Sequence, residues 1–504
     1  MSARLLHGHV LDTLATLPER SVHCVVTSPP YWSLRDYELE PQIWGGDPAC
    51  PHRWGINGSR HKGGPHGAGV LRDGGRGVIA AQAATKTIDT GCVCAACGAW
   101  KGSLGLEPIP DCLGWARGER CSQCYVCHIR TVFAAVQRVL RDDGTLWLNM
   151  GDCYDAGTRA QRDVSRTTKH GYWNNPAITL RPRAGLGALQ RVGLAWRVAL
   201  ALQADGWVLR RDLVWSKTNP LPESVRGWRW ERHRIKRRAG WSAECPHSSH
   251  RLDGLTMRTA HRGDGPSPGI AEWDDCPGCE RCAGSDGLVL HRGAWRPTTA
   301  HEYLFLLTRF GRYYADGDAV REPASPDTHA RYGRGRSSTH KYRDGGPGRQ
   351  TIARTFAHMR GEDVVTDRNL RSVLTLPTQG FRDGHFATFP ERLADIAILS
   401  GSSSHVCSEC GAPWARVEGR EALCRRPTCT HRTAPAGRSV ILDPFAGSGT
   451  TGVVALRHGR DFVGIELSAA YVEMARRRVR DDAPLLNNVD TKGSAGMWPQ
   501  PATG

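Results

Sequence analysis

Residues 439–466 read SVILDPFAGSGTTGVVALRHGRDFVGIE. This order of apolar runs and glycines predicts a strand, a glycine turn, a helix and a second strand. Gly447 and Gly449 would let the backbone approach a ligand closely, and the N-terminus of the next helix offers free N–H groups. Glu466 follows the glycines by about 20 positions, where a Rossmann-like unit places the acid that binds ribose hydroxyls. The pattern predicts a nucleotide-type cofactor site, although ordinary loops also contain two glycines.

A second motif lies near the start of the chain, where residues 22–32 read VHCVVTSPPYW. The apolar run suits a buried parallel strand, so the following turn would lie at the ligand edge of a doubly wound sheet. Ser28 offers a hydroxyl, Pro29-Pro30 a rigid carbonyl and Tyr31 an aromatic ring. These groups suit a pocket for an aromatic amino group. In isolation, the same tetrapeptide would indicate an ordinary polyproline turn.

Together, the two motifs resemble those of the β-class DNA amino-methyltransferases, in which the catalytic loop precedes the cofactor motif. The resemblance implies an α/β, Rossmann-like, S-adenosylmethionine-dependent methyltransferase fold that is circularly permuted. NAD binding is less expected, because the third glycine of the dinucleotide fingerprint is missing. The resemblance assigns catalysis to Ser28, Pro29, Pro30 and Tyr31. It assigns cofactor binding to Asp443, Pro444, Phe445, Gly447, Gly449, Thr450, Glu466 and Phe389.

The expected reaction is direct methyl transfer to an exocyclic amino group of a base in duplex DNA. Because the lone pair of that nitrogen is delocalised into the ring, acceptors such as Ser28 Oγ and the Pro29 carbonyl must hold its N–H bonds. Tyr31 would stack on the base, which has to leave the duplex. The Ser-Pro-Pro form resembles cytosine-N4 enzymes more than adenine-N6 enzymes, which usually carry Asp or Asn in place of Ser28. Adenine N6 remains the alternative. The sequence has no Pro-Cys nucleophile, which argues against the covalent cytosine-C5 route.

Other segments alternate as an α/β fold requires. Strands are predicted over 4–8, 145–149, 207–215 and 301–307, and helices over 131–140, 192–203 and 469–480. The N-terminal strand is expected next to the strand that ends in Glu466, and residues 142–144 are expected to separate a helix from a strand. β-class enzymes usually carry Asp at the position of His9, so the resemblance does not assign an adenine-side contact to this residue.

A single catalytic domain of this class needs roughly 250 residues, and the 504 residues of this chain leave a surplus in insertions. The predicted segments are a catalytic-motif part at 1–40, a Cys/His-rich insertion at 41–127, methyltransferase core at 128–225, a basic and Cys-rich insertion at 226–296, a core strand at 297–310, a target-recognition region at 311–383, a cofactor-covering helix at 384–401, a zinc-ribbon-like insertion at 402–437, the S-adenosylmethionine-binding part at 438–482 and a flexible tail at 483–504.

The insertions carry most of the 18 cysteines. Neither an apolar leader after Met1 nor a membrane-length apolar run is evident, so we expect a cytoplasmic protein with reduced thiols and no membrane partner. Cys-x-x-Cys pairs suit a tetrahedral zinc ion, and small polar insertions without a core need such a staple. The role would be structural.

Four zinc ligand sets are predicted from the spacing of these residues. They are Cys50, His52, Cys94 and Cys97, with Cys92 as a spare; Cys112, Cys121, Cys124 and Cys127, with His128 in place of Cys127 as an option; Cys245, Cys276, Cys279 and Cys282, with His247 competing; and Cys407, Cys410, Cys429 and His431, with Cys424 as a substitute. The isolated Cys24 and Cys153 are expected to be small core residues.

The charge balance indicates a polyanionic partner. Lys and Arg number 67 against 50 Asp and Glu, giving a formal net charge of +17, which favours double-stranded DNA. Residues 226–238 interleave tryptophans with cations, which suits phosphate contact and stacking but also fits a solvated face. Residues 321–371 lie where β-class enzymes carry target recognition. A cognate restriction endonuclease is a possible further partner, and the oligomeric state stays open.

Two classes of function follow. The first is an S-adenosylmethionine-dependent DNA methyltransferase acting on cytosine N4, with zinc-stapled insertions that widen the DNA-binding surface. The second is a non-catalytic, zinc-containing nucleic-acid-binding protein in which the motifs are remnants. The intact Ser28, Tyr31, Asp443 and Glu466 favour the enzyme.

Overall fold

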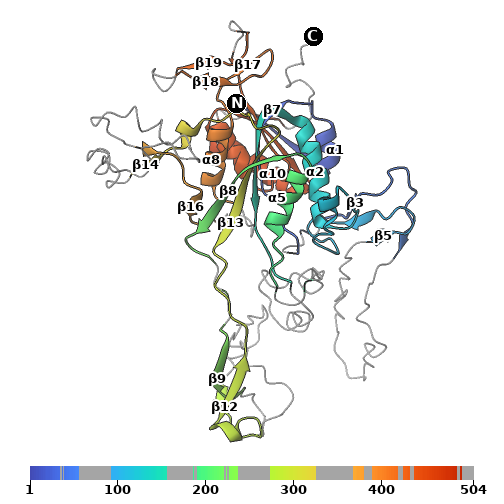
Figure 1. The fold of residues 1–504 in the computed structure, drawn as a ribbon, viewed down its shortest axis with the longest axis vertical. Coiled ribbons are helices and arrows are strands. Elements are labelled where there is room, and N and C mark those ends of the chain that lie inside the picture. Colours follow the sequence, from blue (N-terminus) through green and yellow to red (C-terminus); the bar gives the residue numbers. More distant parts are fainter. Residues whose placement is uncertain are drawn as a thin grey trace, which may run out of the picture.

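The computed structural model describes residues 1–33, 37, 39–55, 92–155, 186, 190–220, 223, 226–236, 273–324, 367–379, 389–417, 424–431, 436–484 and 488–490. Its centre is a nine-stranded sheet (Figure 1). From edge to edge, the strands are β16 (Val373–Leu376), β8 (Val208–Lys217), β13 (His301–Thr308), β7 (Leu140–Met150), β2 (Val22–Thr27), β21 (Val440–Asp443), β22 (Asp461–Glu466), β1 (Ser2–His7) and β23 (Asn488–Asp490).

All strands of this sheet run the same way except β13, which is antiparallel to both of its neighbours. Every residue of β2 is buried, as expected for a strand covered on both faces. The N-terminal strand β1 lies against β22, with Leu5 opposite Gly464. The prediction that the N-terminus completes the C-terminal half of the sheet is therefore confirmed.

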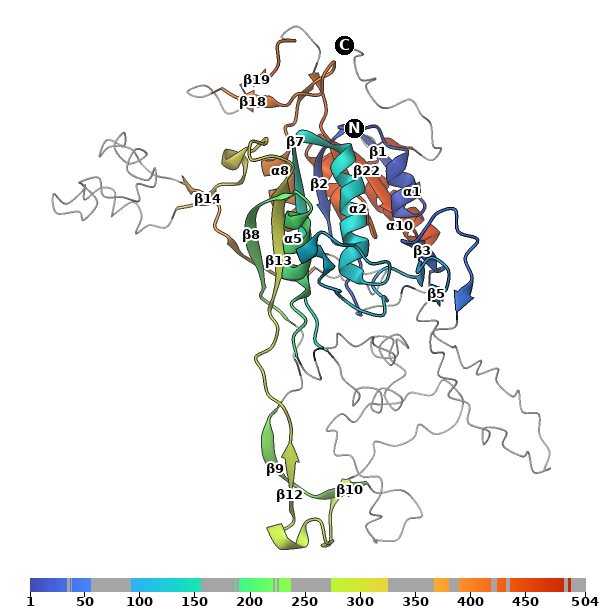
Figure 2. The same cartoon turned by 45° about the vertical axis from the view of Figure 1, so that its right-hand side comes forward.

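Among the described residues, helices cover both faces of the sheet (Figures 1 and 2). One layer holds α1 (Val10–Ala15), α2 (Tyr125–Val139) and α5 (Leu194–Ala204). The other holds α8 (Glu391–Gly401), α9 (Thr450–Arg457) and α10 (Ala469–Asp482). Each layer buries its own apolar cluster, with Leu14 and Phe133 in the first and Ile396 and Val454 in the second. Within the described residues, no helix combines the length and apolar character needed to cross a bilayer.

The predicted strands at 4–8, 145–149, 207–215 and 301–307 and the three predicted helices are present, with shifted ends. The break expected at 142–144 is wrong. β7 runs through these residues because the pairing with β2 shifts register there: Val22 lies opposite Leu140, whereas Cys24 lies opposite Thr145. The extra residues form a bulge, in which Arg141 donates to Asp143 at 2.8 Å.

The insertions fold into small sheets of their own. Residues 42–102 contain β3 (Gln42–Trp44), β4 (Trp54–Gly55), β5 (Cys92–Cys94) and β6 (Trp100–Gly102), in the order β3-β6-β5-β4. Two more pairs, β17 (Val406–Cys407) with β20 (Ala436–Gly437) and β18 (Trp414–Arg416) with β19 (Arg425–Pro427), lie between α8 and β21.

The basic insertion forms an arm that extends away from the central sheet (Figures 1 and 2). It contains the hairpin of β9 (Trp228–Arg232) and β12 (Leu288–Arg292) and, at its far end, β10 (Arg234–Lys236) paired with β11 (Trp273–Asp275). The predicted recognition region contributes β14 (Glu322–Pro323), β15 (Asp367–Arg368) and the edge strand β16. Its residues 325–366 lie outside the described residues, so recognition there stays a prediction.

Candidate active site and metal centres

The two sequence motifs meet at the carboxyl ends of adjacent parallel strands. β2 ends at Thr27 and β21 ends at Asp443. The two strands pair directly, with Val25 opposite Leu442. A cavity opens beside these ends, with an empty volume of about 1160 Å³ when its open mouth is included. Of the predicted site residues, the following line it: Ser28, Pro30, Phe389, Asp443, Pro444, Phe445, Gly447, Thr450 and Glu466. Pro29, Tyr31 and Gly449, which the structure also describes, are not among the lining residues.

Asp443 ties the two motifs together. Its Oδ1 accepts hydrogen bonds from Thr27 Oγ1 at 2.6 Å and from the Phe445 backbone N–H at 3.1 Å, and its Oδ2 accepts one from Thr451 Oγ1 at 2.7 Å. Burial raises the pKa of the Asp443 carboxyl from 3.8 to about 6, although the hydrogen bonds from Thr27 and Thr451 lower it. The carboxylate therefore fixes the end of β2 and the glycine turn after β21 in one arrangement.

Glu466 holds the glycine turn from the neighbouring strand. Its Oε2 accepts a hydrogen bond from the Gly447 N–H at 2.9 Å, and its Oε1 accepts one from the Ser468 N–H at 2.9 Å. Burial raises the pKa of this carboxyl, while the backbone donors lower it. Gly447 and Gly449 have φ values of +49° and +79°, in the left-handed region, and a Cβ on Gly449 would lie 2.9 Å from the Cβ of Ala475. The turn therefore requires glycine at position 449.

Tyr31 is anchored by its hydroxyl. Ser28 Oγ donates to that oxygen at 3.0 Å, and Tyr31 donates in turn to Glu302 Oε2 at 2.9 Å, with Asn149 Oδ1 an alternative acceptor at 3.1 Å. The other oxygen of Glu302 accepts from Lys217 Nζ at 2.5 Å. Burial raises the pKa of the tyrosine hydroxyl well above its usual value, and the charge of Glu302 raises it further. Tyr31 therefore stays protonated at neutral pH.

Three members of this network were not identified from the sequence. Glu302 lies on β13, Lys217 ends β8 and Asn149 lies on β7. The sequence offered two signals: Glu302 is a charged residue in the apolar segment HEYLFLL, and Lys217 ends the strand at WSK. Neither gives a distance to Tyr31, because the contact depends on β13 running antiparallel beside β7.

The Cys/His-rich insertion supplies a second group of residues that sequence reasoning did not assign to the site. Trp44 on β3, together with Ser103 and Leu104 after β6, lines the same cavity as the glycine turn. His9 also lines it and packs edge to face against Trp44, with ring centroids 4.9 Å apart. Part of this insertion is therefore a wall of the cavity.

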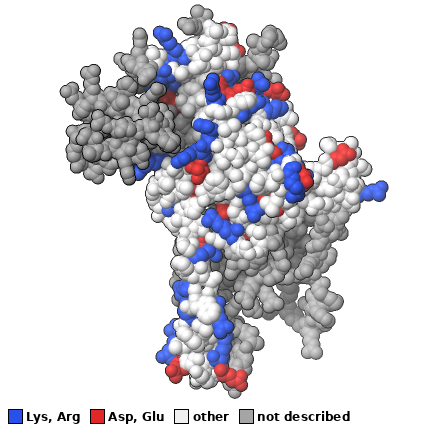
Figure 3. All heavy atoms as spheres, viewed as in Figure 1, with Lys and Arg blue, Asp and Glu red and all other residues white. Residues whose placement is uncertain are grey.

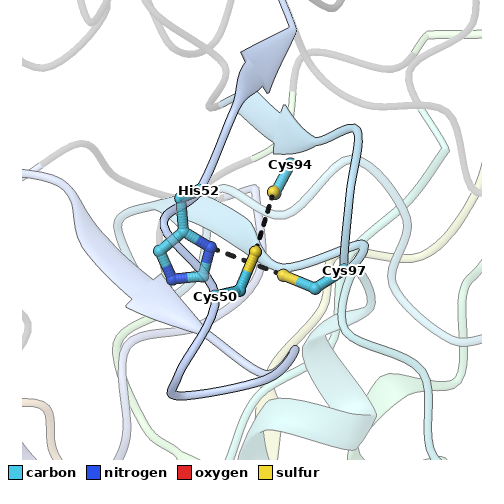
Figure 4. Close-up of side chains that lie close together, drawn as sticks. All are labelled: Cys50, His52, Cys94 and Cys97. Atoms are coloured by element: carbon cyan, nitrogen blue, oxygen red, sulfur yellow. Dashed lines mark hydrogen bonds between the residues drawn. The ribbon is translucent and has the colours of Figure 1, made fainter.

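Four clusters of cysteine and histidine have all their ligand atoms within 4.8 Å of one another. The first, Cys50, His52, Cys94 and Cys97, points its side chains toward a common centre in Figure 4. Cys50 Sγ lies 3.9 Å from Cys94 Sγ, and Cys97 Sγ lies 3.4 Å from His52 Nδ1. Sulfurs bound to one tetrahedral zinc ion lie about 3.8 Å apart, so the donors have the spacing that zinc needs.

Two further clusters are the predicted sets Cys112, Cys121, Cys124 and Cys127, and Cys407, Cys410, Cys429 and His431. Cys112 Sγ lies 3.6 Å from Cys127 Sγ. The optional ligand His128 is used elsewhere: its ring nitrogens lie 3.0 Å from Glu107 Oε1 and 3.0 Å from the Ser122 carbonyl. Cys424, the proposed substitute, is not a member of the last cluster.

The fourth cluster differs from the predicted set. It joins His233 to Cys276, Cys279 and Cys282, with His233 Nδ1 3.3 Å from Cys279 Sγ. The predicted ligand Cys245 and its competitor His247 lie outside the described residues. His233 was missed because it follows Arg232 in a strongly basic segment and lies more than 40 positions before Cys276. Its burial, at 3% exposure, was not visible from the sequence.

Comparison with known proteins supplies the family. The family model described as DNA methylase matches residues 22–477. The Type II methyltransferase M.Cfr9I of Citrobacter freundii is 26% identical over 484 residues, which cover 95% of this chain and 88% of that protein. M.SmaI of Serratia marcescens is 25% identical over 481 residues, covering 95% and 91%. The solved structure of PvuII DNA methyltransferase (cytosine-N4-specific) superposes with a TM-score of 0.39 at 12% identity, covering 97% of this chain and 95% of that one.

The match to the family model includes the catalytic turn, the cofactor turn and every strand of the central sheet between them. The chain belongs to the DNA methylase family whose members methylate N6 or N4 amino groups.

Proposed function

We propose that this protein is an S-adenosylmethionine-dependent DNA methyltransferase that methylates N4 of cytosine by flipping the base out of duplex DNA. The observation that carries the proposal is the single cavity lined by Ser28 and Pro30 from one motif and by Asp443 to Thr450 from the other. The relatives named Type II methyltransferases support it. A circularly permuted methyltransferase fold is supported by the order of the motifs and by β1 lying beside β22.

The cavity has the donor set that this cofactor requires. Glu466 offers a buried carboxylate to ribose hydroxyls, and the glycine turn with the N-terminus of α9 offers backbone N–H groups. Phe389, Phe445 and Ile465 give the cavity apolar walls. When bound, S-adenosylmethionine supplies a methyl group activated by a positively charged sulfur.

The direction of the hydrogen bonds makes Ser28 an acceptor. Since Ser28 gives its proton to Tyr31, and Tyr31 gives its own to Glu302 or Asn149, the lone pairs of Ser28 Oγ stay available for the amino N–H of a base. The Pro29 carbonyl would accept the second N–H. Together they favour a tetrahedral nitrogen, whose lone pair can attack. Tyr31 is held by its hydroxyl, and its ring faces Gly151, where a Cβ would lie 2.7 Å from the ring.

Methyl transfer from labelled S-adenosylmethionine to DNA tests this function. Wild type should label duplex DNA, and Ser28→Ala should lose most of the transfer while keeping DNA binding. Nucleoside mass spectrometry of the product then identifies the base. N4-methylcytosine in the product would support the proposal, whereas N6-methyladenine would show that adenine is the target base. Equal labelling by both proteins would show that Ser28 takes no part in the mechanism.

We also propose that the four clusters hold structural zinc. In the Cys112 cluster, hydrogen bonds from Cys124 and Cys127 lower the pKa of Cys121 to about 4, whereas the bonds with Cys121 and Cys127 raise that of Cys124 strongly. Cys124 therefore needs a nearby cation to ionise at neutral pH, and a zinc ion would supply that charge. All four positions of each cluster are filled by protein ligands, which suits a structural role.

A further inference from the structure

The arm that carries β9 and β12 begins and ends at the active-site edge of the sheet. The chain leaves β8 after Lys217 and returns at His301, the first residue of β13. β8 runs parallel to β7 and β2, so Lys217 lies at the same edge of the sheet as Thr27. The arm therefore projects from the side of the molecule on which the catalytic turn opens (Figures 1 and 2).

One face of the hairpin exposes two tryptophans. Trp228 is 69% exposed and Trp230 is 56% exposed, and they lie on the same face as Arg232 because side chains alternate along β9. Across the hairpin, Arg292 lies opposite Trp228, with its guanidinium 5.2 Å from the ring centroid. Exposed indoles so close together are unusual on a surface that contacts only water.

The described residues provide no carboxylate partner for the cations on this face, Arg232 and Arg292. On the opposite face, Arg229 donates to Glu231 at 2.5 Å. The hairpin is thus two-sided, with a self-paired face and a face of free cations and aromatic rings, which we call the tryptophan face (Trp228, Trp230, Arg232 and Arg292).

Charge is also divided along the length of the arm. Figure 3 shows Lys and Arg along the stem and acidic side chains at the tip. The acidic residues at the tip include Asp274, Asp275, Glu280 and Asp286, next to the cluster of His233 and three cysteines. A polyanion would therefore be attracted more strongly by the stem than by the tip, where Arg234 and Arg281 lie among these carboxylates.

We propose that the tryptophan face binds the backbone of duplex DNA beside the base that enters the active site. This inference rests on the proposed function. Arg232 and Arg292 would contact phosphates, and the two indoles would pack against sugars and base edges. Duplex DNA is the occupant that the free arginines and the formal net charge of +17 favour, whereas an apolar protein partner would leave those cations unpaired.

The experiment measures binding of the full-length protein to fluorescein-labelled duplexes of about 15 and about 40 base pairs and arbitrary sequence, over a series of salt concentrations. The variants are Trp228→Ala/Trp230→Ala and Arg232→Gln/Arg292→Gln. Arg480→Gln is a control for the loss of a surface charge, because Arg480 is exposed at the end of α10, remote from the active-site edge. Zinc content and circular dichroism verify that each variant folds.

The tryptophan pair should weaken binding to the longer duplex about tenfold. The arginine pair should reduce the slope of log affinity against log salt by about 2. Arg480→Gln should change neither quantity, and all proteins should bind the shorter duplex more nearly alike. Unchanged affinity and slope in both arm variants would overturn the inference, as would a change in sedimentation without a change in DNA binding. If the wild type methylates DNA in that case, the proposed function survives; if it does not methylate, the proposed function fails separately.

Discussion

The hydroxyl of Tyr31 lies 2.9 Å from Oε2 of Glu302, although 271 positions separate the two residues in the chain. Lys217 binds the other carboxylate oxygen, so an ion pair on β8 and β13 fixes the tyrosine of the catalytic turn. The orientation of Ser28 follows from it, because Ser28 donates to the same hydroxyl. Two strands outside both sequence motifs thereby position Ser28 and Tyr31.

Glu302→Gln should therefore slow methyl transfer without weakening cofactor binding. The amide preserves the shape but removes the charge that pairs with Lys217 and holds the Tyr31 hydroxyl, and small misplacements of reacting groups cost up to about 100-fold in rate. We expect a fall of roughly 10- to 100-fold in the single-turnover rate, with the S-adenosylmethionine affinity unchanged. Tyr31→Phe in the same background should add less than it does alone, since both changes break one network. Additive effects would show that the two residues act independently.

The pKa of Asp443 makes a prediction about stability. In the unfolded chain this carboxyl titrates near 3.8, and in the folded protein near 6. Between these values the folded state binds more protons than the unfolded state, so the free energy of unfolding falls as pH rises through this window. The full difference is on the order of 3 kcal/mol. Above pH 6 this penalty is constant, and below 3.8 it is absent.

Asp443→Asn removes this titration, so the variant is the reference against which the wild type is compared at each pH. Urea unfolding of both proteins at a series of pH values between about 4 and 7 measures the difference in their free energies of unfolding. The wild type should lose stability relative to the variant as pH rises across the window. A difference that stays constant with pH would mean that the folded-state pKa of Asp443 is close to its ordinary value.

Alanine substitutions at Gly449 and Gly459 distinguish the cost of backbone strain from the cost of steric crowding. Both have φ values in the left-handed region, +79° and +73°, but a Cβ on Gly449 would meet Ala475 at 2.9 Å, whereas nothing lies within 4 Å of one on Gly459. Gly459→Ala should destabilise by roughly 1 to 2 kcal/mol from strain alone. Gly449→Ala should add roughly 1 to 3 kcal/mol of overpacking. Thermal unfolding compares the two, and equal losses would show that α10 moves to accommodate the methyl group.

The ligand sets make a prediction about zinc content. His233→Ala should lower the zinc content by about one equivalent per chain, because it removes one of the four donors at the tip of the arm. Cys245→Ala should leave the content unchanged, although Cys245 has the more familiar Cys-Pro-His spacing. Elemental analysis of the purified variants measures both. The opposite pattern would restore Cys245 as the ligand.

Most elements of the central sheet could be predicted from the sequence because they have a local signature. The short edge strands β16 and β23 were not predicted, and β23 lies in the segment expected to be a flexible tail. Apolar runs such as 22–26 and 439–442 mark buried strands, and the glycine turn at 447–449 marks a ligand site. The bulge in β7 could not be predicted, because Asp142-Asp143-Gly144 has the composition of a turn and only the pairing with β2 keeps it in the strand.

The residues of the candidate site likewise fall into those that could be predicted from the sequence and those that could not. Ser28 and Asp443 lie in motifs that are recognisable locally, whereas Glu302, Lys217 and Trp44 reach the site only through the order of strands in the sheet and the path of an insertion. His233 is the clearest case of a missed residue. A single histidine in a basic segment carries no metal signal until the hairpin brings it to three cysteines.

The first metal cluster should control cofactor affinity. Cys94 and Cys97 hold the turn between β5 and β6, and β6 places Trp100 opposite Trp44, which lines the cavity. The Trp44 indole donates to the Gly102 carbonyl at 3.2 Å, so the wall depends on β6 staying in place. Loss of zinc from this cluster should loosen that wall.

Cys97→Ser should therefore weaken S-adenosylmethionine binding, because it removes one of the four donors of this cluster and loosens the wall that Trp44 contributes. Cys279→Ser is the matched control, because it disrupts a cluster of the same composition on the arm, which extends away from the central sheet (Figure 1). It should leave cofactor affinity unchanged while still lowering the zinc content. Isothermal titration with S-adenosylmethionine measures both variants. If both lose affinity equally, zinc acts through overall stability; if Cys97→Ser binds like wild type, the wall stands without its cluster.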